Sequence, residues 1–264
     1  MKRQVDNRKG FTLIELLLAM AVFLVICGAM FGLLEVSQQR YSSETQLSGA
    51  FQETRLAVDQ ISRDVNDAGF PSAGMFSKLP DPTLYAFSPM AWVPGYSATS
   101  CFIGTGGGGT CTTPGDFDLI LETTLQTPTG PVVSWIRYQL QGTTLYRAVA
   151  AKTDTDPSGP TTAPGIMVPF LTNVMNNATG QFLQITASYP TMFPTGNPVP
   201  IFQFMCDTPT GAVACPLAGT YNSPQNIRDV DITLIVQTQQ PDAQTGQLKL
   251  IELNGRGHRL NPSN

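Results

Sequence analysis

The sequence predicts an α+β protein: one long N-terminal helix, apolar and then amphipathic, packed on a mostly antiparallel β-sheet head. Three observations lead to this prediction. An apolar run extends from Phe11 to Leu34, and it continues without a break into a segment of helical periodicity. After Pro71 the composition changes to short β-type runs separated by turn residues. The head of about 200 residues is long enough to bury a core of its own.

Residues 11–34 are long enough to cross a membrane. As a helix they would span about 36 Å, which exceeds the hydrocarbon core of a typical bilayer. The flanking charges before the span are mostly basic: Lys2, Arg3, Arg8 and Lys9, against Asp6 alone. By the positive-inside rule, the N-terminus is cytoplasmic and the chain after the span lies on the other side. A secretory signal would have a shorter apolar region followed by a small-residue cleavage site, so we expect this run to be retained.

Residues 35–70 are expected to form the amphipathic half of the same helix. Apolar-dominated positions recur at alternating intervals of four and three: Leu47, Phe51, Thr54, Val58, Ile61, Val65 and Ala68. Such a stripe is typical of a helix that packs on a core. The polar residues, among them Glu53, Asp59 and Asp64, are predicted to lie on the other faces. Gly69 is a C-cap signal and Pro71 ends the run, which predicts one helix over residues 11–68.

Residues 71–264 are predicted to form one β-rich head domain. The expected strands are Phe117–Leu125, Val132–Leu140, Thr144–Ala150, Phe182–Ala187, Ile201–Met205, Ile227–Thr238 and Gln247–Leu253. The second and third strands read as a hairpin around Gly142, and the last two read as a hairpin joined by residues 239–246. The sequence therefore predicts a sheet built largely from neighbouring antiparallel strands.

The start of the apolar run carries the most specific motif, Lys9-Gly10-Phe11-Thr12-Leu13-Ile14-Glu15. A carboxylate five residues into a membrane-length helix is costly unless a partner compensates it. Cleavage after Gly10 would supply that partner, because the new amine of Phe11 in one subunit could face Glu15 of a neighbour. The stretch from Gly10 to Leu17 resembles the class III prepilin signal shared by type IV pilins and type II secretion pseudopilins.

This resemblance implies a processing and assembly route. A prepilin peptidase/methyltransferase would remove residues 1–10 after Gly10 and methylate Phe11, while Glu15 would be the carboxylate used in filament assembly. The other implied partners are minor pilins, the major pilin and an inner-membrane assembly platform. The subunit would first span the bacterial inner membrane with its N-terminus cytoplasmic and its head periplasmic. It would then enter a pilus or pseudopilus filament.

A looser similarity extends along the chain. Four segments are similar to PilW-type minor pilins and to J-type minor pseudopilins: residues 54–70, 135–140, 145–147 and 227–234. The retained Glu15 argues against the K-type pseudopilin, which lacks that carboxylate. The similarity implies a minor pilin that primes or caps assembly of a type IV pilus, at or near the filament tip. A minor pseudopilin of type II secretion is the alternative, and a tip adhesin or a membrane-anchored binding protein are further alternatives.

Cysteine usage fits an oxidising compartment. Cys101 and Cys111 flank a glycine-rich stretch, and Cys206 and Cys215 flank a Pro/Gly loop. Four cysteines permit three pairings; we expect disulfides 101–111 and 206–215, with Cys27 left free in the membrane helix. A zinc site is the alternative, but neither pair has CxxC spacing and His258 is the single histidine.

No enzymatic activity and no cofactor are expected. The glycine run between the first two cysteines lacks the Lys-Ser or Lys-Thr of a phosphate-binding loop. A histidine-dependent catalytic site would have to use His258, and no nucleophile motif surrounds it. Asp154 and Asp156 precede a Pro-Ser-Gly turn and are candidate calcium ligands, with a solvated acidic turn as the alternative.

The charge of the chain argues against direct nucleic-acid binding. Without residues 1–10 the chain has 11 Lys+Arg and 18 Asp+Glu, a side-chain charge of −7. A nucleic-acid interface is basic, and the head shows no cluster of Lys and Arg apart from the sparse pair Arg256 and Arg259. An acidic head is better matched to other subunits or to a cell-surface partner.

Overall fold

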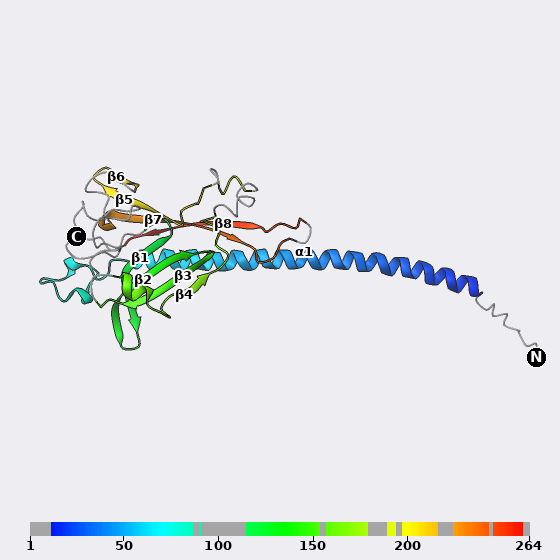
Figure 1. The fold of residues 1–264 in the computed structure, drawn as a ribbon, viewed down its shortest axis with the longest axis horizontal. Coiled ribbons are helices and arrows are strands. Elements are labelled where there is room, and N and C mark those ends of the chain that lie inside the picture. Colours follow the sequence, from blue (N-terminus) through cyan, green and yellow to red (C-terminus); the bar gives the residue numbers. More distant parts are fainter. Residues whose placement is uncertain are drawn as a thin grey trace, which may run out of the picture.

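The computed structural model describes residues 12–86, 90, 115–153, 157–178, 189–193, 197–215, 224–242 and 245–260. Its longest element is α1, which extends from Leu13 to Asp67 as one helix. The C-terminal half of α1 lies along the β-rich head, and its N-terminal half projects away from it (Figure 1). The predicted α+β architecture of a long helix and a β head is therefore confirmed.

The end of α1 follows the sequence signals. Ala68 is the C-cap, and Gly69 has a φ of +86°, a left-handed conformation that glycine adopts without steric cost. The Gly69 main-chain N–H donates a hydrogen bond of 2.7 Å to the carbonyl oxygen of Glu122, which ties the helix end to the head.

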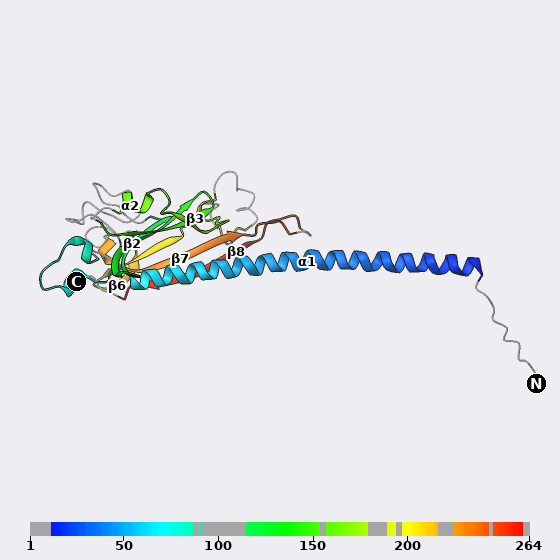
Figure 2. The same ribbon diagram turned by 90° about the horizontal axis from the view of Figure 1, so that it is seen from below.

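Two four-stranded antiparallel sheets form the head. The first has the order β1-β2-β3-β4, with β1 at Asp118–Thr127, β2 at Gly130–Gln141, β3 at Thr144–Ala151 and β4 at Val168–Leu171. The second has the order β6-β5-β7-β8, with β5 at Phe202–Thr208, β6 at Gly211–Ala214, β7 at Ile227–Gln237 and β8 at Leu250–His258. Short helices occupy Ala73–Met75 (η1), Pro82–Leu84 (η2), Ser158–Thr162 (α2) and Pro224–Asn226 (η5). Figure 2 shows α1 running along one side of these layers.

Both predicted hairpins are confirmed, but the division into two sheets was not predicted. Gln141 pairs with Thr144 across the turn at Gly142, whose φ is +59°, and β7 pairs with β8 along its length. Sequence reasoning missed β4 and β6, because each has four residues, β4 contains Pro169 and all of β6 is exposed. The predicted strand at 182–187 lies outside the described residues.

One core joins α1 to both sheets. It contains Val58, Ile61 and Val65 from the helix, Leu121, Ile136 and Leu145 from the first sheet, and Phe202, Val230 and Ile232 from the second. The predicted stripe is buried from Thr54 onward, but Phe51 is 43% exposed and Leu47 is half-buried. The stripe therefore marks the packed face correctly but begins too early, because the head covers α1 closely only beyond Phe51.

Candidate functional site

The N-terminal part of α1 is an exposed apolar rod. From Leu13 to Leu34 every side chain is exposed except that of Cys27, which is half-buried. The helix is long and apolar enough to cross a membrane, as judged by length and composition. So large an apolar surface is unfavourable in water, which indicates that lipid or other apolar helices surround this part of the protein.

Glu15 lies in the first turn of this rod and forms a capping box with Thr12. The main-chain N–H and the hydroxyl of Thr12 both donate to Glu15 Oε2 at 2.9 Å, and Thr12 Oγ1 accepts from the Glu15 N–H at 3.4 Å. Ionised carboxylates have about four lone-pair sites, so the box leaves acceptor capacity for a further donor. Gly10 and Phe11, the predicted cleavage and methylation positions, lie outside the described residues.

Two glycines of β8 let α1 approach the head closely. An added Cβ at Gly255 would collide with Val58, and one at Gly257 would lie 2.5 Å from the Cβ of Val65. Real Cβ atoms do not approach other atoms so closely. The contact between α1 and β8 therefore depends on the absence of side chains at these two positions.

A buried polar network fixes α1 to the first sheet. Tyr138 donates its hydroxyl hydrogen bond to Asp64 Oδ2 at 2.6 Å, and Arg147 Nη2 lies 3.0 Å from the same oxygen. Gln60 donates to Asp64 Oδ1 at 2.8 Å. Burial, followed by the negative charge of Asp64, raises the pKa of Tyr138 well above its ordinary value. The hydroxyl therefore stays protonated and keeps its role as a donor.

The expectation that Asp64 lies on a polar face of α1 was wrong. Its exposed fraction is 6%, because it follows the buried Ile61 by three residues and so lies on the same helix face. The network was missed because its partners come from β2 and β3, far along the chain. The three-residue spacing between Ile61 and Asp64 was the only sequence signal for the burial of Asp64.

Polar contacts near Ser43 are the first, counted from the N-terminus of α1, between the helix and the head. Ser43 donates to Asp242 Oδ2 at 3.0 Å, and Lys249 Nζ lies 2.5 Å from the same oxygen. One turn further along, Gln46 accepts from the main-chain N–H of Gln240 at 3.2 Å. These contacts come from the connection between β7 and β8, which extends along α1 (Figure 1). The part of α1 from Leu13 to Arg40, which we call the stalk, precedes these contacts and projects away from the head.

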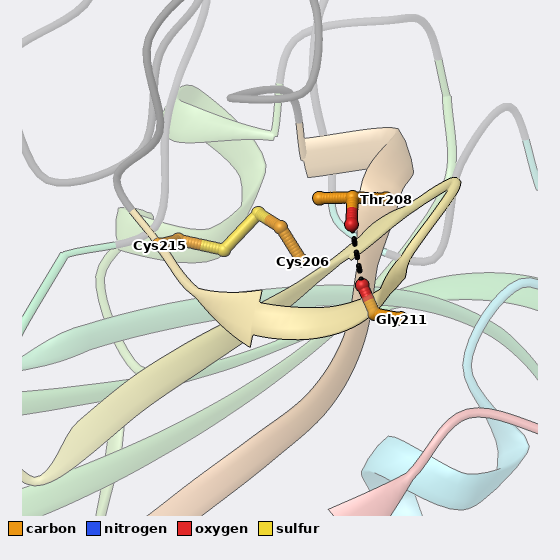
Figure 3. The surroundings of a disulfide bond; sticks show 4 residues. All are labelled: Cys206, Thr208, Gly211 and Cys215. Carbon is orange, nitrogen blue, oxygen red and sulfur yellow. Dashed lines mark hydrogen bonds between the residues drawn. A yellow bond between two sulfur atoms is a disulfide. The ribbon is translucent and has the colours of Figure 1, made fainter.

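A disulfide joins Cys206, near the end of β5, to Cys215, just after β6, and their Cα atoms are 5.6 Å apart (Figure 3). In the adjoining turn between β5 and β6, the hydroxyl of Thr208 donates a hydrogen bond of 2.7 Å to the carbonyl oxygen of Gly211. Cys27 is free. The other expected pair, Cys101 and Cys111, lies outside the described residues.

His258 ends β8 and is held by hydrogen bonds. Its Nδ1 lies 2.5 Å from Asp229 Oδ1, and its main-chain N–H donates to Asn66 Oδ1 at 2.8 Å. Within the described residues no group of three His, Cys, Asp or Glu side chains is arranged to hold a metal ion. Asp154 and Asp156 lie outside those residues, so the calcium prediction stays a prediction.

Comparison with known families gives one match, at the N-terminus. The prokaryotic N-terminal methylation motif matches residues 6–31, which include Glu15 and most of the exposed apolar rod. Comparisons with curated proteins and with solved structures gave no match. The motif is the prepilin-type signal, and it supports membrane anchoring and processing by a prepilin peptidase.

Proposed function

We propose that this type IV pilin-like protein is a minor pilin, which helps to prime or cap assembly of a type IV pilus at or near the filament tip. The observation that carries the proposal is the methylation motif at residues 6–31, placed on an exposed apolar helix with Glu15 in its first turn. The head is bound to the other half of the same helix. The protein thus has both parts of a filament subunit, a core-forming rod and a surface domain.

The proposed route begins in the inner membrane, with the basic residues before the span in the cytoplasm and the head in the periplasm. Removal of residues 1–10 would expose the amine of Phe11. As the rod leaves the lipid for the filament, Glu15 would accept a charged hydrogen bond from the Phe11 amine of a neighbouring subunit. Because an unpaired carboxylate in an apolar core is strongly penalised, this pairing would select the correct axial register.

The finer assignment to a PilW-type pilin rests on the looser similarity of residues 54–70, 135–140, 145–147 and 227–234. A minor pseudopilin of type II secretion is the second candidate, because the matched motif is shared by both systems. Deleting the gene separates them. Loss of surface pili with normal protein secretion favours the pilin, whereas normal pili with lost secretion favours the pseudopilin.

The N-terminal mass of the protein from its native membrane tests the first step. We expect a mature chain that begins with N-methylated Phe11, and an uncleaved Met1 form in a strain without the prepilin peptidase. An N-terminus at Met1 in both strains would mean a plain membrane anchor and would refute the proposal.

Replacing the assembly carboxylate tests the second step. Glu15→Val should leave cleavage after Gly10 intact and reduce incorporation into filaments by at least tenfold, a loss of about 1.4 kcal/mol or more in assembly free energy. The matched control is Glu35→Val, since Glu35 is an exposed glutamate at the other end of the stalk. Incorporation is measured by immunoblotting of sheared filaments. Equal incorporation of both variants would argue against a role for Glu15 in setting the axial register between neighbouring subunits.

A further inference from the structure

A polar groove of about 180 Å³ opens beside Glu53, between α1 and the head. Residues from three segments line it: Glu53 of α1, Thr172 and Asn173 just after β4, and Gln237 at the end of β7. The groove therefore lies where the helix meets one segment from each of the two sheets.

Several polar side chains in this groove have no partner among the residues that the structure describes. The Oε1 atom of Gln237 is buried and has no hydrogen-bond partner there. The side chains of Glu53, Thr172 and Asn173 form no hydrogen bond or ion pair with the described part of the chain. Native proteins satisfy nearly all buried polar atoms. The oxygen of Gln237 therefore indicates that a donor or a cation belongs in the groove.

The charge of the groove favours a cation over a neutral donor. Glu53 is the single charged residue among those that line it, so its carboxylate has no positive lining group to balance it. The amide oxygen of Gln237 adds the negative end of a dipole beside this charge. A hollow lined by one sign of charge concentrates ions of the opposite sign.

The available ligand atoms select the kind of cation. Carboxylate, amide and hydroxyl oxygens are hard ligands, and neither cysteine nor histidine lines the groove, which disfavours zinc and copper. Mg²⁺ requires nearly ideal octahedral geometry, whereas Ca²⁺ accepts about six to eight oxygen ligands in flexible arrangements. The oxygens here come from three separate segments, and the groove has room for waters beside an ion. Both features suit Ca²⁺ better than Mg²⁺.

We propose that this groove is a calcium site, with Glu53 and Gln237 as protein ligands and with Thr172, Asn173 and waters completing the coordination. A site with one carboxylate binds weakly, with a dissociation constant of about 10⁻⁴–10⁻³ M, the range of extracellular calcium modules. The ion joins α1 to both sheets one residue before Thr54, where the buried face of the helix begins. It stabilises the attachment of the helix to the head within one chain, in a pilin and in a pseudopilin alike.

Calorimetric titration tests the site directly. The full chain, in a non-ionic detergent and stripped of metal with a chelator, is titrated with CaCl₂. We expect a saturable site that Glu53→Gln weakens at least tenfold, and that Gln237→Met also weakens because it replaces the buried oxygen with an apolar side chain of similar length. The matched control is Asp59→Asn, which should bind as the wild type does, since Asp59 is an exposed acid of the same helix that does not line the groove.

Urea unfolding with and without calcium provides the second arm. For a dissociation constant of about 10⁻³ M, about 10 mM Ca²⁺ should lower the unfolding equilibrium constant of the wild type by about tenfold, because the ion binds the folded chain alone. The Asp59→Asn control should respond equally. Glu53→Gln should fold without calcium as the wild type does, since Glu53 is exposed and has no partner in the described chain, but calcium should not stabilise it.

Three results would overturn the calcium site: no saturable binding up to about 10 mM Ca²⁺, equal weakening by Glu53→Gln and Asp59→Asn, or binding that Glu53→Gln leaves intact. In the last case a variant with both Asp154→Asn and Asp156→Asn shows whether the ion binds at those residues, the calcium ligands expected from sequence. If the proposal is right, this double variant keeps the site that Glu53→Gln removes. Each of these results leaves the pilin role untouched, because processing at Gly10 is measured separately.

Discussion

The two halves of α1 have the same backbone conformation and opposite surroundings. From Leu13 to Leu34 the helix is apolar on all sides apart from Glu15, and it is exposed apart from the half-buried Cys27. Between Thr54 and Val65 it buries one face against two sheets. Among the residues that the structure describes, the first half has no packed neighbours that could make one side different from another. Its apolar surface is suited to lipid or to other helices, while the second half is suited to one particular head.

This contrast predicts where substitutions act. Changes in the packed half should lower the stability of the isolated subunit. Changes in the exposed half should leave that stability intact and affect membrane insertion or assembly. The three pairs of variants below test the contrast in order of decreasing effect, all by urea unfolding of the detergent-solubilised full chain followed by tryptophan fluorescence.

The largest effect is expected at Asp64. Asp64→Ala should cost roughly 3 kcal/mol, because it removes the shared acceptor of Tyr138 and Arg147 and leaves their donors poorly paired. Its control, Asp59→Ala, changes an exposed carboxylate five residues away and should stay within about 0.5 kcal/mol. Similar losses in the two variants would mean that the buried network does not anchor the helix.

A glycine pair compares the two halves directly. Gly257→Ala forces a Cβ into Val65 and should cost about 1–3 kcal/mol. Gly28→Ala meets no atom within 4 Å and should leave subunit stability unchanged or raise it slightly, by up to about 1 kcal/mol, through higher helix propensity. If Gly257→Ala were as stable as the wild type, the close approach of α1 and β8 would not be required for folding.

The smallest effect concerns Tyr138 and depends on pH. Its pKa is higher in the folded protein than the ordinary value of about 10, because burial disfavours the phenolate. Above that pH the unfolded chain loses the proton while the folded protein keeps it. Stability that is fully present below pH 10 therefore falls as the pH rises, by at most about 1.4 kcal/mol per pH unit from this group.

Tyr138→Phe should remove this alkaline loss and cost about 1 kcal/mol near neutral pH, where the hydrogen bond to Asp64 is absent. Tyr41→Phe, at a 73% exposed position, should change neither the alkaline loss of stability nor the free energy of unfolding near neutral pH. A stability profile between pH 8 and 11 that is equally steep in the wild type and in Tyr138→Phe would assign the alkaline loss to other groups.

Much of the fold could be predicted because its signals are local. The apolar run, the four-and-three spacing and Gly69 placed α1, and turn residues such as Gly142 placed the hairpins. The strands that escaped prediction, β4 and β6, have too few residues for an alternating pattern to appear. The candidate site divides in the same way. The position of Glu15 in the first turn of α1 could be predicted from its neighbours in sequence, and its role in assembly stays a prediction, whereas Asp64 was assigned to the wrong face.

The sequence by itself determined the N-terminal methylation motif, the apolar rod and the face of the amphipathic helix that packs on the head. Each of these depends on residues within a few helical turns of one another. Only the tertiary structure decided that Asp64 is buried against Tyr138, that two glycines of β8 admit Val58 and Val65, and that a groove forms beside Glu53. These features join residues that are 74 or more positions apart. A periodic pattern indicates which face of a helix is packed, but it does not indicate which distant side chains pack against it.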